Sequence, residues 1–260
     1  MSSRISGIHP VLEALRAGRR ELRRVLLSNA RHDRKLDEIE AAAREARVPV
    51  QRVPAAALDR LAAGKAHQGV IAEVGEAALA DPEEVLARAG KPPLLLVLDG
   101  IEDPRNLGAV IRSAAAAGAD GLFIPSHGAA GLTDVCAKAS AGAVERLPVA
   151  RIGNVVAFLK SLKERGIWVA GLDAKGTTPW TGFDLRVPLA LVLGGEGRGL
   201  RRLARETCDV LLSIPLRSEV ESLNLSVAAG VALFEAVRQR TQTGAGEGRA
   251  GARVHPESGQ

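Results

Sequence analysis

The sequence predicts an α/β protein of 260 residues in two parts. Short apolar runs typical of strands alternate with segments whose apolar residues recur every three or four positions, as in helices. Two runs, 94–98 and 189–193, are wholly apolar, which is typical of parallel strands buried on both faces. The charge is also uneven, because residues 1–75 hold 14 Lys and Arg against 9 Asp and Glu, whereas residues 76–240 hold 19 of each.

Residues 1–74 are expected to form a small α/β domain. The expected helices cover 9–19, 33–46 and 55–63, and the expected strands cover 24–27, 48–53 and 69–74. Gly64 follows the third helix, and glycine is favoured just after a helix end. Residues 75–92 are expected to form a linker, with a short helix that starts at Asp81 and has Pro82 in its first turn.

Residues 93–240 are expected to form a second domain, a mostly parallel sheet with helices on both faces. The pattern predicts strands at 94–98, 121–124, 167–172, 189–193 and 210–214, and helices at 107–117, 155–164 and 225–238. Ligands of such sheets bind beyond the carboxyl ends of the strands. Residues 241–260 are rich in Gly, Ala and Arg without an apolar period, so a disordered tail is expected there.

The composition excludes several classes of protein. No apolar run approaches the ~18 residues of a membrane-spanning helix, and the first residues lack an apolar signal region. Cys136 and Cys208 form neither a metal-ligand spacing nor a disulfide framework, which fits a reducing cytoplasm. Cys136 is expected to be a small buried apolar residue. With four Phe, two Trp and no Tyr, the chain has too few rings to read RNA mainly by base stacking.

The excess positive charge lies in the first domain. Arginine is suited to forked contacts with phosphate, and seven arginines stand within 19 positions there: Arg16, Arg19, Arg20, Arg23, Arg24, Arg31 and Arg34. A basic part beside a neutral part predicts a nucleic-acid-binding domain attached to a catalytic domain. The alternative is a solvated basic face without a partner.

Polar and glycine residues gather after three of the predicted strands. The first loop leads into a helix with Asn106 and Arg112, for which a helix cap and a surface ion pair are the alternative roles. The second loop, 194–199, has four glycines in six residues, which let a ligand approach the backbone or simply form a turn. It matches neither a P-loop nor a Rossmann fingerprint. The third loop holds Ser222 and Asn224, either of which can cap the long helix that follows.

Together, and in this order, the three loops resemble the SpoU (TrmH-type) family of RNA ribose 2′-O-methyltransferases, which use S-adenosylmethionine. The resemblance covers residues 94–240 and rests on Asn-Leu-Gly-x-x-x-Arg at 106–112, Gly-x-Glu-Gly-x-Gly at 194–199, Ile-Pro at 214–215 and Ser-Leu-Asn-x-Ser-x-Ala at 222–228. Gly-Ile-His-Pro at 7–10 and His-Gln-Gly at 67–69 resemble the small ribosomal-protein-like domain with which one branch of the family holds RNA.

The resemblance implies a fold, a cofactor and a set of site residues. It implies a deep trefoil knot in residues 93–240, S-adenosylmethionine bound by the second and third loops, and a homodimer packed through the knotted domains. The cofactor contacts carried over by position are Gly194, Gly195, Ile214, Leu216 and Leu223. The catalytic positions carried over are Asn106, Arg112, Glu196, Ser222 and Asn224. The branch implies 23S rRNA as the partner, with methylation of a guanosine ribose in the peptidyl-transferase P loop, in the cytoplasm and without a membrane.

The chemistry expected from the resemblance lacks an ordinary base, because no histidine lies in the three motifs. A guanidinium has a pKa above about 12, which opposes a base role for arginine. We therefore expect Arg112 to clamp the target phosphate and polarise the 2′-OH, while a phosphate oxygen or water takes the proton. Two alternatives stay open: the same chemistry on a tRNA or another rRNA ribose, and a non-catalytic RNA-binding or ribosome-assembly protein. A nicotinamide-dependent dehydrogenase is disfavoured, because the dinucleotide fingerprint is missing.

Overall fold

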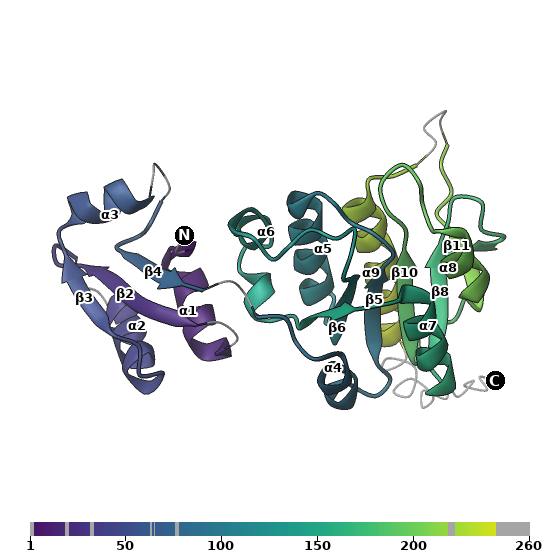
Figure 1. Cartoon of the computed structure of the whole chain (residues 1–260), viewed down its shortest axis with the longest axis horizontal. Coiled ribbons are helices and arrows are strands. Elements are labelled where there is room, and N and C mark those ends of the chain that lie inside the picture. The colour runs from purple at the N-terminus through teal and green to yellow at the C-terminus, as the bar shows by residue number, and fades with distance from the viewer. Residues whose placement is uncertain are drawn as a thin grey trace, which may run out of the picture.

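The computed structural model contains two sheets, one within residues 3–74 and one within residues 94–213 (Figure 1). It describes residues 3–18, 21–31, 34–62, 64, 66–75, 78–217 and 222–242. The expected disordered tail lies outside the described residues from residue 243 onward. Residues 241 and 242 belong to the last helix, so this helix extends beyond the expected end at 238.

The small domain is a four-stranded mixed sheet in the order β1-β4-β2-β3, in which β4 is antiparallel to β1 and β2, and β2 is parallel to β3. Alternate residues of β2 face opposite sides: Val25 and Leu27 pack with α1 and α2, and Leu26 packs with α3. The elements are β1 (Ser3–Ser6), α1 (Ile8–Ala17), β2 (Leu22–Ser28), α2 (Arg34–Glu45), β3 (Val50–Val53), α3 (Ala55–Ala62) and β4 (Val70–Val74).

The connection between the domains contains α4 (Pro82–Arg88), which begins where the sequence predicts a helix. The Asp81 carboxylate caps it by accepting the backbone N–H groups of Glu83 and Glu84 at 2.9 and 3.1 Å. The two domains also touch directly. The Arg146 guanidinium donates to the Glu13 carboxylate, with 2.6 Å between Nε and Oε2, and this pair lowers the pKa of Glu13.

The larger domain is a seven-stranded sheet in the order β7-β6-β5-β10-β8-β11-β9, and every neighbouring pair of strands is parallel. This confirms the predicted parallel sheet. The strands are β5 (Leu94–Leu98), β6 (Gly121–Pro125), β7 (Val149–Ile152), β8 (Trp168–Leu172), β9 (Thr178–Pro179), β10 (Leu189–Leu193) and β11 (Val210–Ser213).

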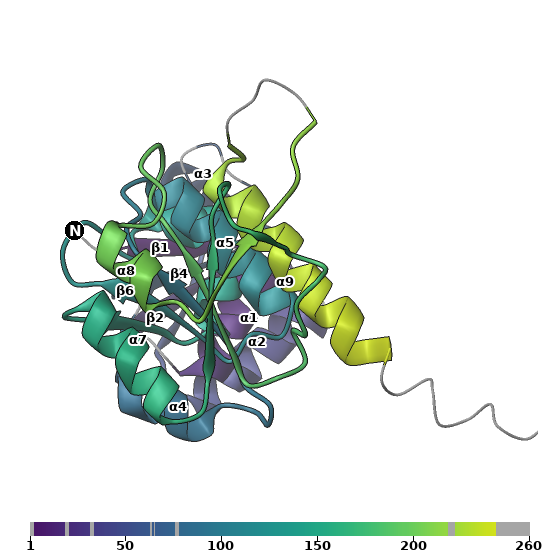
Figure 2. The same ribbon diagram turned by 90° about the vertical axis from the view of Figure 1, so that its right-hand side faces the viewer.

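Helices cover both faces of this sheet (Figure 2). The helices are α5 (Pro104–Ala116), α6 (Asp134–Ala139), α7 (Val155–Glu164), α8 (Arg202–Thr207) and α9 (Leu225–Gln242), with a 3₁₀ turn at Ala143–Glu145. Residues of α5, α6 and α9 share one buried cluster with Leu94, Leu96 and Leu98, whereas α4, α7 and α8 share the other with Leu95 and Val97. Cys136 is fully buried in the first cluster, as expected. Within the described residues, no helix is long and apolar enough to cross a membrane.

Candidate active site

The three polar loops all lie at one edge of the large sheet. They follow β5, β10 and β11, and because these strands are parallel their carboxyl ends point the same way. β5 and β10 are neighbours, while β8 separates β10 from β11. In Figure 1, the described ends of the connection from β11 to α9, residues 214–217 and 222–224, lie at this edge.

The first loop ends in a capped helix. The Asp103 carboxylate accepts the backbone N–H of Arg105 at 2.8 Å, and Pro104 occupies the first helical position of α5. Asn106 therefore lies within the first turn, and its side chain is available for other contacts. The alternative role of Asn106 as a helix cap is wrong, because Asp103 fills that position.

Three of the expected site residues meet through hydrogen bonds. The Asn106 side-chain amide donates to the Glu196 carboxylate. The Asn224 amide in turn donates to Asn106 Oδ1 at 3.2 Å. Each residue comes from a different loop, so this cluster ties the ends of β5, β10 and β11 together. We call Asn106, Glu196 and Asn224 the three-loop cluster.

Asn224 has a second task, which agrees with its alternative role as a cap. Its Oδ1 accepts the backbone N–H of Ser226 at 2.8 Å and the Ser226 hydroxyl at 2.6 Å, at the start of α9. Both the capping role and the contact with Asn106 are therefore present in one side chain. Ser222 is exposed nearby in the third loop, and residues 218–221 lie outside the described residues.

The glycine-rich loop folds back on itself. The backbone N–H of Gly199 donates to the Gly195 carbonyl at 3.0 Å. A Cβ atom on Gly194 would lie 1.8 Å from the carbonyl carbon of Gly199, so only glycine permits this approach. Gly197 and Gly199 have φ angles of +74° and +63°, which glycine adopts without strain. The backbone conformation of the loop therefore explains why glycines stand at these positions, whether or not a ligand binds there.

A buried carboxylate anchors the end of this loop. Asp99, which follows β5 directly and is 4% exposed, accepts the backbone N–H of Arg201 at 2.8 Å and forms an ion pair with its guanidinium at 3.0 Å. The same guanidinium donates to the Asp99 carbonyl at 2.6 Å. The sequence analysis missed this pair. An acidic residue immediately after a wholly apolar strand is the signal that could have identified Asp99.

The expected cofactor contacts lie in the second and third loops. Gly194 is buried, Gly195 is half-buried at the end of β10, and Ile214, Leu216 and Leu223 are half-buried in the third loop. Half-buried aliphatic side chains and backbone free of side chains are groups of the kind that bind an adenosine. The Glu196 carboxylate at the rim fits a ligand with a positive charge.

Arg112 stands apart from the three-loop cluster. Six residues along an α-helix correspond to a rotation of about 240°, so Arg112 and Asn106 lie on different faces of α5. The Arg112 side chain is exposed, and it makes no hydrogen bond or ion pair within the described part of the chain. Among the described residues, its alternative role in a surface ion pair is not seen, and its guanidinium is available to bind an anion.

Comparison with known proteins identifies the family. The SpoU rRNA Methylase family model matches residues 93–234, and the model for RNA 2′-O ribose methyltransferase substrate binding matches residues 4–79. The chain is 46% identical over 240 residues to the 23S rRNA (guanosine-2′-O-)-methyltransferase RlmB of Xylella fastidiosa, covering 91% of this chain and 96% of that one. The RlmB of Pseudomonas putida is 43% identical, with 91% and 96% covered.

A solved structure agrees with these matches. The SpoU methyltransferase AviRb from Streptomyces viridochromogenes, in complex with the cofactor AdoMet, superimposes with a TM-score of 0.76 at 28% identity and covers 93% of this chain and 91% of that one. The parallel sheet and its three-loop edge are thus those of an RNA 2′-O-ribose methyltransferase. The chain belongs to the SpoU rRNA methylase family and has that family's substrate-binding domain at its N-terminus. The expected activity and methyl donor are confirmed at the level of the family.

Proposed function

We propose that this protein transfers a methyl group from S-adenosylmethionine to the ribose 2′-OH of a guanosine in 23S rRNA, in the peptidyl-transferase P loop. The target is supported by the names of relatives that are 43–46% identical over nearly their whole length. The observation that carries the proposal is the three-loop cluster, since it joins one polar side chain from each family motif at one sheet edge. A cytoplasmic location, where bacterial rRNA is made, is part of the proposal.

The methyl donor would lie against the second and third loops. Gly194 and Gly195 offer backbone groups at the end of β10, and the aliphatic side chains of Ile214, Leu216 and Leu223 would cover the adenosine. S-adenosylmethionine supplies an electrophilic methyl group on a sulfonium, a leaving group that needs no acid. Glu196 would favour the positive charge of the sulfonium while Asn106 holds its carboxylate in place.

The RNA would meet Arg112, Ser222 and Asn224. An exposed guanidinium that has no partner among the described residues can fork onto the phosphate beside the target ribose. By fixing that phosphate, Arg112 would position the 2′-OH for in-line attack and lower the cost of losing its proton, which passes to a phosphate oxygen or water. Ser222 would donate or accept a hydrogen bond at the ribose.

A homodimer with a deep trefoil knot in each chain is also part of the proposal. Because Arg112 lies on a different face of α5 from Asn106, we infer that it serves the site of a second copy of the chain. The outward face of α9 supports such pairing, because Val227 and Phe234 are 50% and 51% exposed on it. The knot is supported by the insertion of β10 between β5 and β8 and by the return of the chain after β11, which places Asn224 against Asn106.

Transfer of labelled methyl groups tests the function directly. Wild type and Arg112→Ala are incubated with labelled S-adenosylmethionine and either 23S rRNA or tRNA. We expect label on 23S rRNA at one 2′-O-methylguanosine and none with Arg112→Ala. Arg112→Lys distinguishes a phosphate-binding role of Arg112 from a role as the base. If Arg112 binds the phosphate, the lysine variant should keep partial activity; if Arg112 is the base, the variant should keep almost none. Label on tRNA alone would agree with the proposed methyl transfer and refute 23S rRNA as the target. Failure to bind S-adenosylmethionine would refute the proposed enzymatic activity.

The small domain would hold the RNA mainly by charge. Each phosphate contact to single-stranded RNA contributes about −0.7 to the slope of log affinity against log salt. Deletion of residues 1–75 is therefore expected to flatten the slope measured for rRNA binding. An unchanged slope would contradict an RNA-binding role for this domain.

A further inference from the structure

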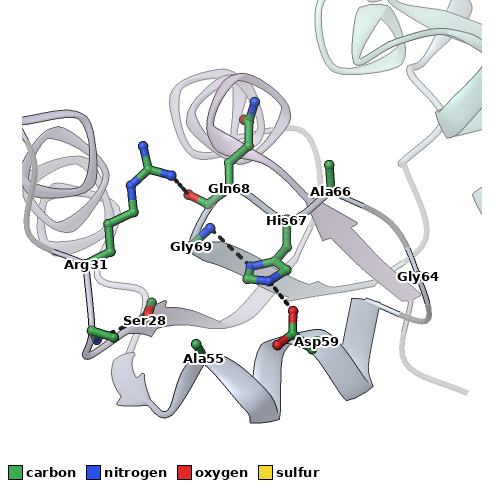
Figure 3. A pocket seen from close by; sticks show the side chains of 10 residues that line it. Ser28, Arg31, Ala55, Asp59, Gly64, Ala66, His67, Gln68 and Gly69 are labelled. Carbon is green, nitrogen blue, oxygen red and sulfur yellow. Dashed lines mark hydrogen bonds and ion pairs between the residues drawn. The ribbon is translucent and has the colours of Figure 1, made fainter.

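An open pocket of about 630 Å³ lies in the small domain, away from the three-loop cluster. It is formed where the end of β2 meets α3 and the turn that leads into β4 (Figure 3). Its volume is within the range of small-molecule sites, roughly 300–1,000 Å³. We call it the β2–α3 pocket.

A rigid turn forms one wall of this pocket. Gln68 and Gly69 have φ angles of +52° and +85°, and the first is uncommon for a residue with a side chain. Side-chain contacts hold the turn: Gln68 Oε1 accepts the backbone N–H of Ile8 at 3.0 Å, and His67 Nδ1 accepts that of Gly69 at 3.1 Å. The His-Gln-Gly motif thus fixes the shape of the pocket.

The same turn fixes a carboxylate at the rim. Because His67 Nδ1 accepts a hydrogen bond, the ring proton is on Nε2, which donates to Asp59 Oδ1 at 3.0 Å. The His67 side chain is only 16% exposed, whereas that of Asp59 is 70% exposed. His67 therefore orients Asp59 and leaves it facing solvent as a pure hydrogen-bond acceptor.

The opposite wall carries positive charge. Arg31 lies across the pocket from Asp59 in Figure 3 and donates to the Gln68 carbonyl at 3.0 Å. Between the two charges the lining consists of small residues: Ala30, Ala55, Gly64, Ala66 and Gly69. Such a lining leaves room for a flat ring to lie against the backbone.

We propose that the β2–α3 pocket binds an unpaired guanosine nucleotide of the RNA, with the guanine at Asp59 and its phosphate toward Arg31. Among the four RNA bases, only guanine presents two adjacent N–H donors, N1–H and the 2-amino group, to a carboxylate. On the corresponding edge, adenine and cytosine each present one N–H donor group beside an acceptor, and uracil presents one N–H between two carbonyl acceptors. The proposal rests on the proposed function, since it takes the small domain to hold substrate RNA.

The position of the pocket suits a second contact on one RNA. In Figure 1, α3 is on the upper side of the small domain, and the described ends of the β11–α9 connection, residues 214–217 and 222–224, are on the upper side of the large domain. An RNA lying along this side reaches both. The guanosine held at Asp59 would be a different nucleotide from the one that is methylated.

Nuclear magnetic resonance of the full chain with labelled histidine tests the proposal. The His67 signal, assigned with His67→Gln, is followed during titration with GMP, AMP and inorganic phosphate. We expect GMP to move it at concentrations about tenfold below AMP, the discrimination typical of a forked base contact. Asp59→Asn is expected to remove this preference. Asp37→Asn, the same charge change on the exposed surface of α2, is expected to keep it.

The outcomes of this titration distinguish a failure of the guanosine-pocket proposal from a failure of the proposed methyltransferase function. Equal responses to GMP and AMP, or an equal response to phosphate alone, would overturn a guanine site. No response of His67 up to the solubility limit of GMP would overturn any nucleotide site. Because this readout needs no methyl transfer, a failed transfer assay with a retained GMP preference would contradict the proposed target and leave the pocket standing. An unfolded Asp59→Asn variant would be replaced by Asp59→Ser.

Discussion

Gly108→Ala is expected to destabilise the protein although it improves the helix propensity of α5. Alanine in a helix interior is favoured over glycine by about 0.8–1.0 kcal/mol. The added Cβ would lie 2.4 Å from the Cys136 carbonyl oxygen and 2.6 Å from the Ala139 Cβ, both in α6. Neither atom can rotate away, so α6 must move, and overpacking of this kind costs about 1–3 kcal/mol. Because the overpacking cost outweighs the gain in helix propensity, we expect a net loss of up to about 2 kcal/mol in the free energy of unfolding.

Gly230→Ala is the matched control, because it makes the same change inside α9. The nearest atom to its added Cβ would be Ser113 Oγ at 3.7 Å, an ordinary contact. This variant is expected to gain about 0.5–1 kcal/mol. In thermal unfolding, the Tm of Gly108→Ala should lie below that of Gly230→Ala by up to about 10 °C. Equal or higher stability of Gly108→Ala than of wild type would refute the packing argument. Its methyl transfer should also fall, since α5 positions Asn106.

Three further predictions follow from charged and buried groups. Arg240→Ala should lower the free energy of unfolding by about 2–4 kcal/mol in urea titrations. The Arg240 guanidinium donates hydrogen bonds to four backbone carbonyls, those of Pro92, Pro93, Leu185 and Val187. A loss of at most about 1 kcal/mol, which is typical of an exposed ion pair, would contradict this. The ion pair between Glu13 and Arg146 should be fully formed at pH values above the ordinary pKa of a glutamate. It should be lost as the pH falls through the lowered pKa of Glu13. Small-angle scattering should then show a larger radius of gyration in acid, and Glu13→Gln should show it at neutral pH; identical radii would refute the contact. Burial raises the pKa of Cys208 to about 12, so iodoacetamide should modify this thiol slowly at mildly alkaline pH and rapidly in urea; rapid labelling of the folded protein would contradict its burial.

The sequence predicted those elements whose local signals are strong. Apolar runs such as Leu94–Leu98 give fully buried strands, and Asp81 with Pro82 marks the start of α4. Short elements were missed. β7 has four residues, of which Arg151 is exposed, so no alternation stands out. β1, α6, α8 and β9 have six residues or fewer, too few to establish a period.

The site was predictable in its chemistry and less so in its geometry. Parallel strands align their carboxyl ends, which is why Asn106, Glu196 and Asn224 meet. The strand order, with β10 between β5 and β8, depends on contacts distant in sequence and has no local signal. Gly108 shows a similar limit. It belongs to the first motif, yet its neighbours are backbone atoms of α6, which only the fold reveals.

The pairing of β1 with β4 has an architectural consequence. Ser3 stands opposite Val74 in that antiparallel pair, so the first and last strands of the small domain are neighbours and the domain closes on itself. All four described strands of its sheet come from residues 3–74. A unit built in this way can be exchanged for another without rethreading the larger sheet. With the proposed role of the small domain in RNA binding, such an exchange would change the RNA that is held while the larger domain stays the same.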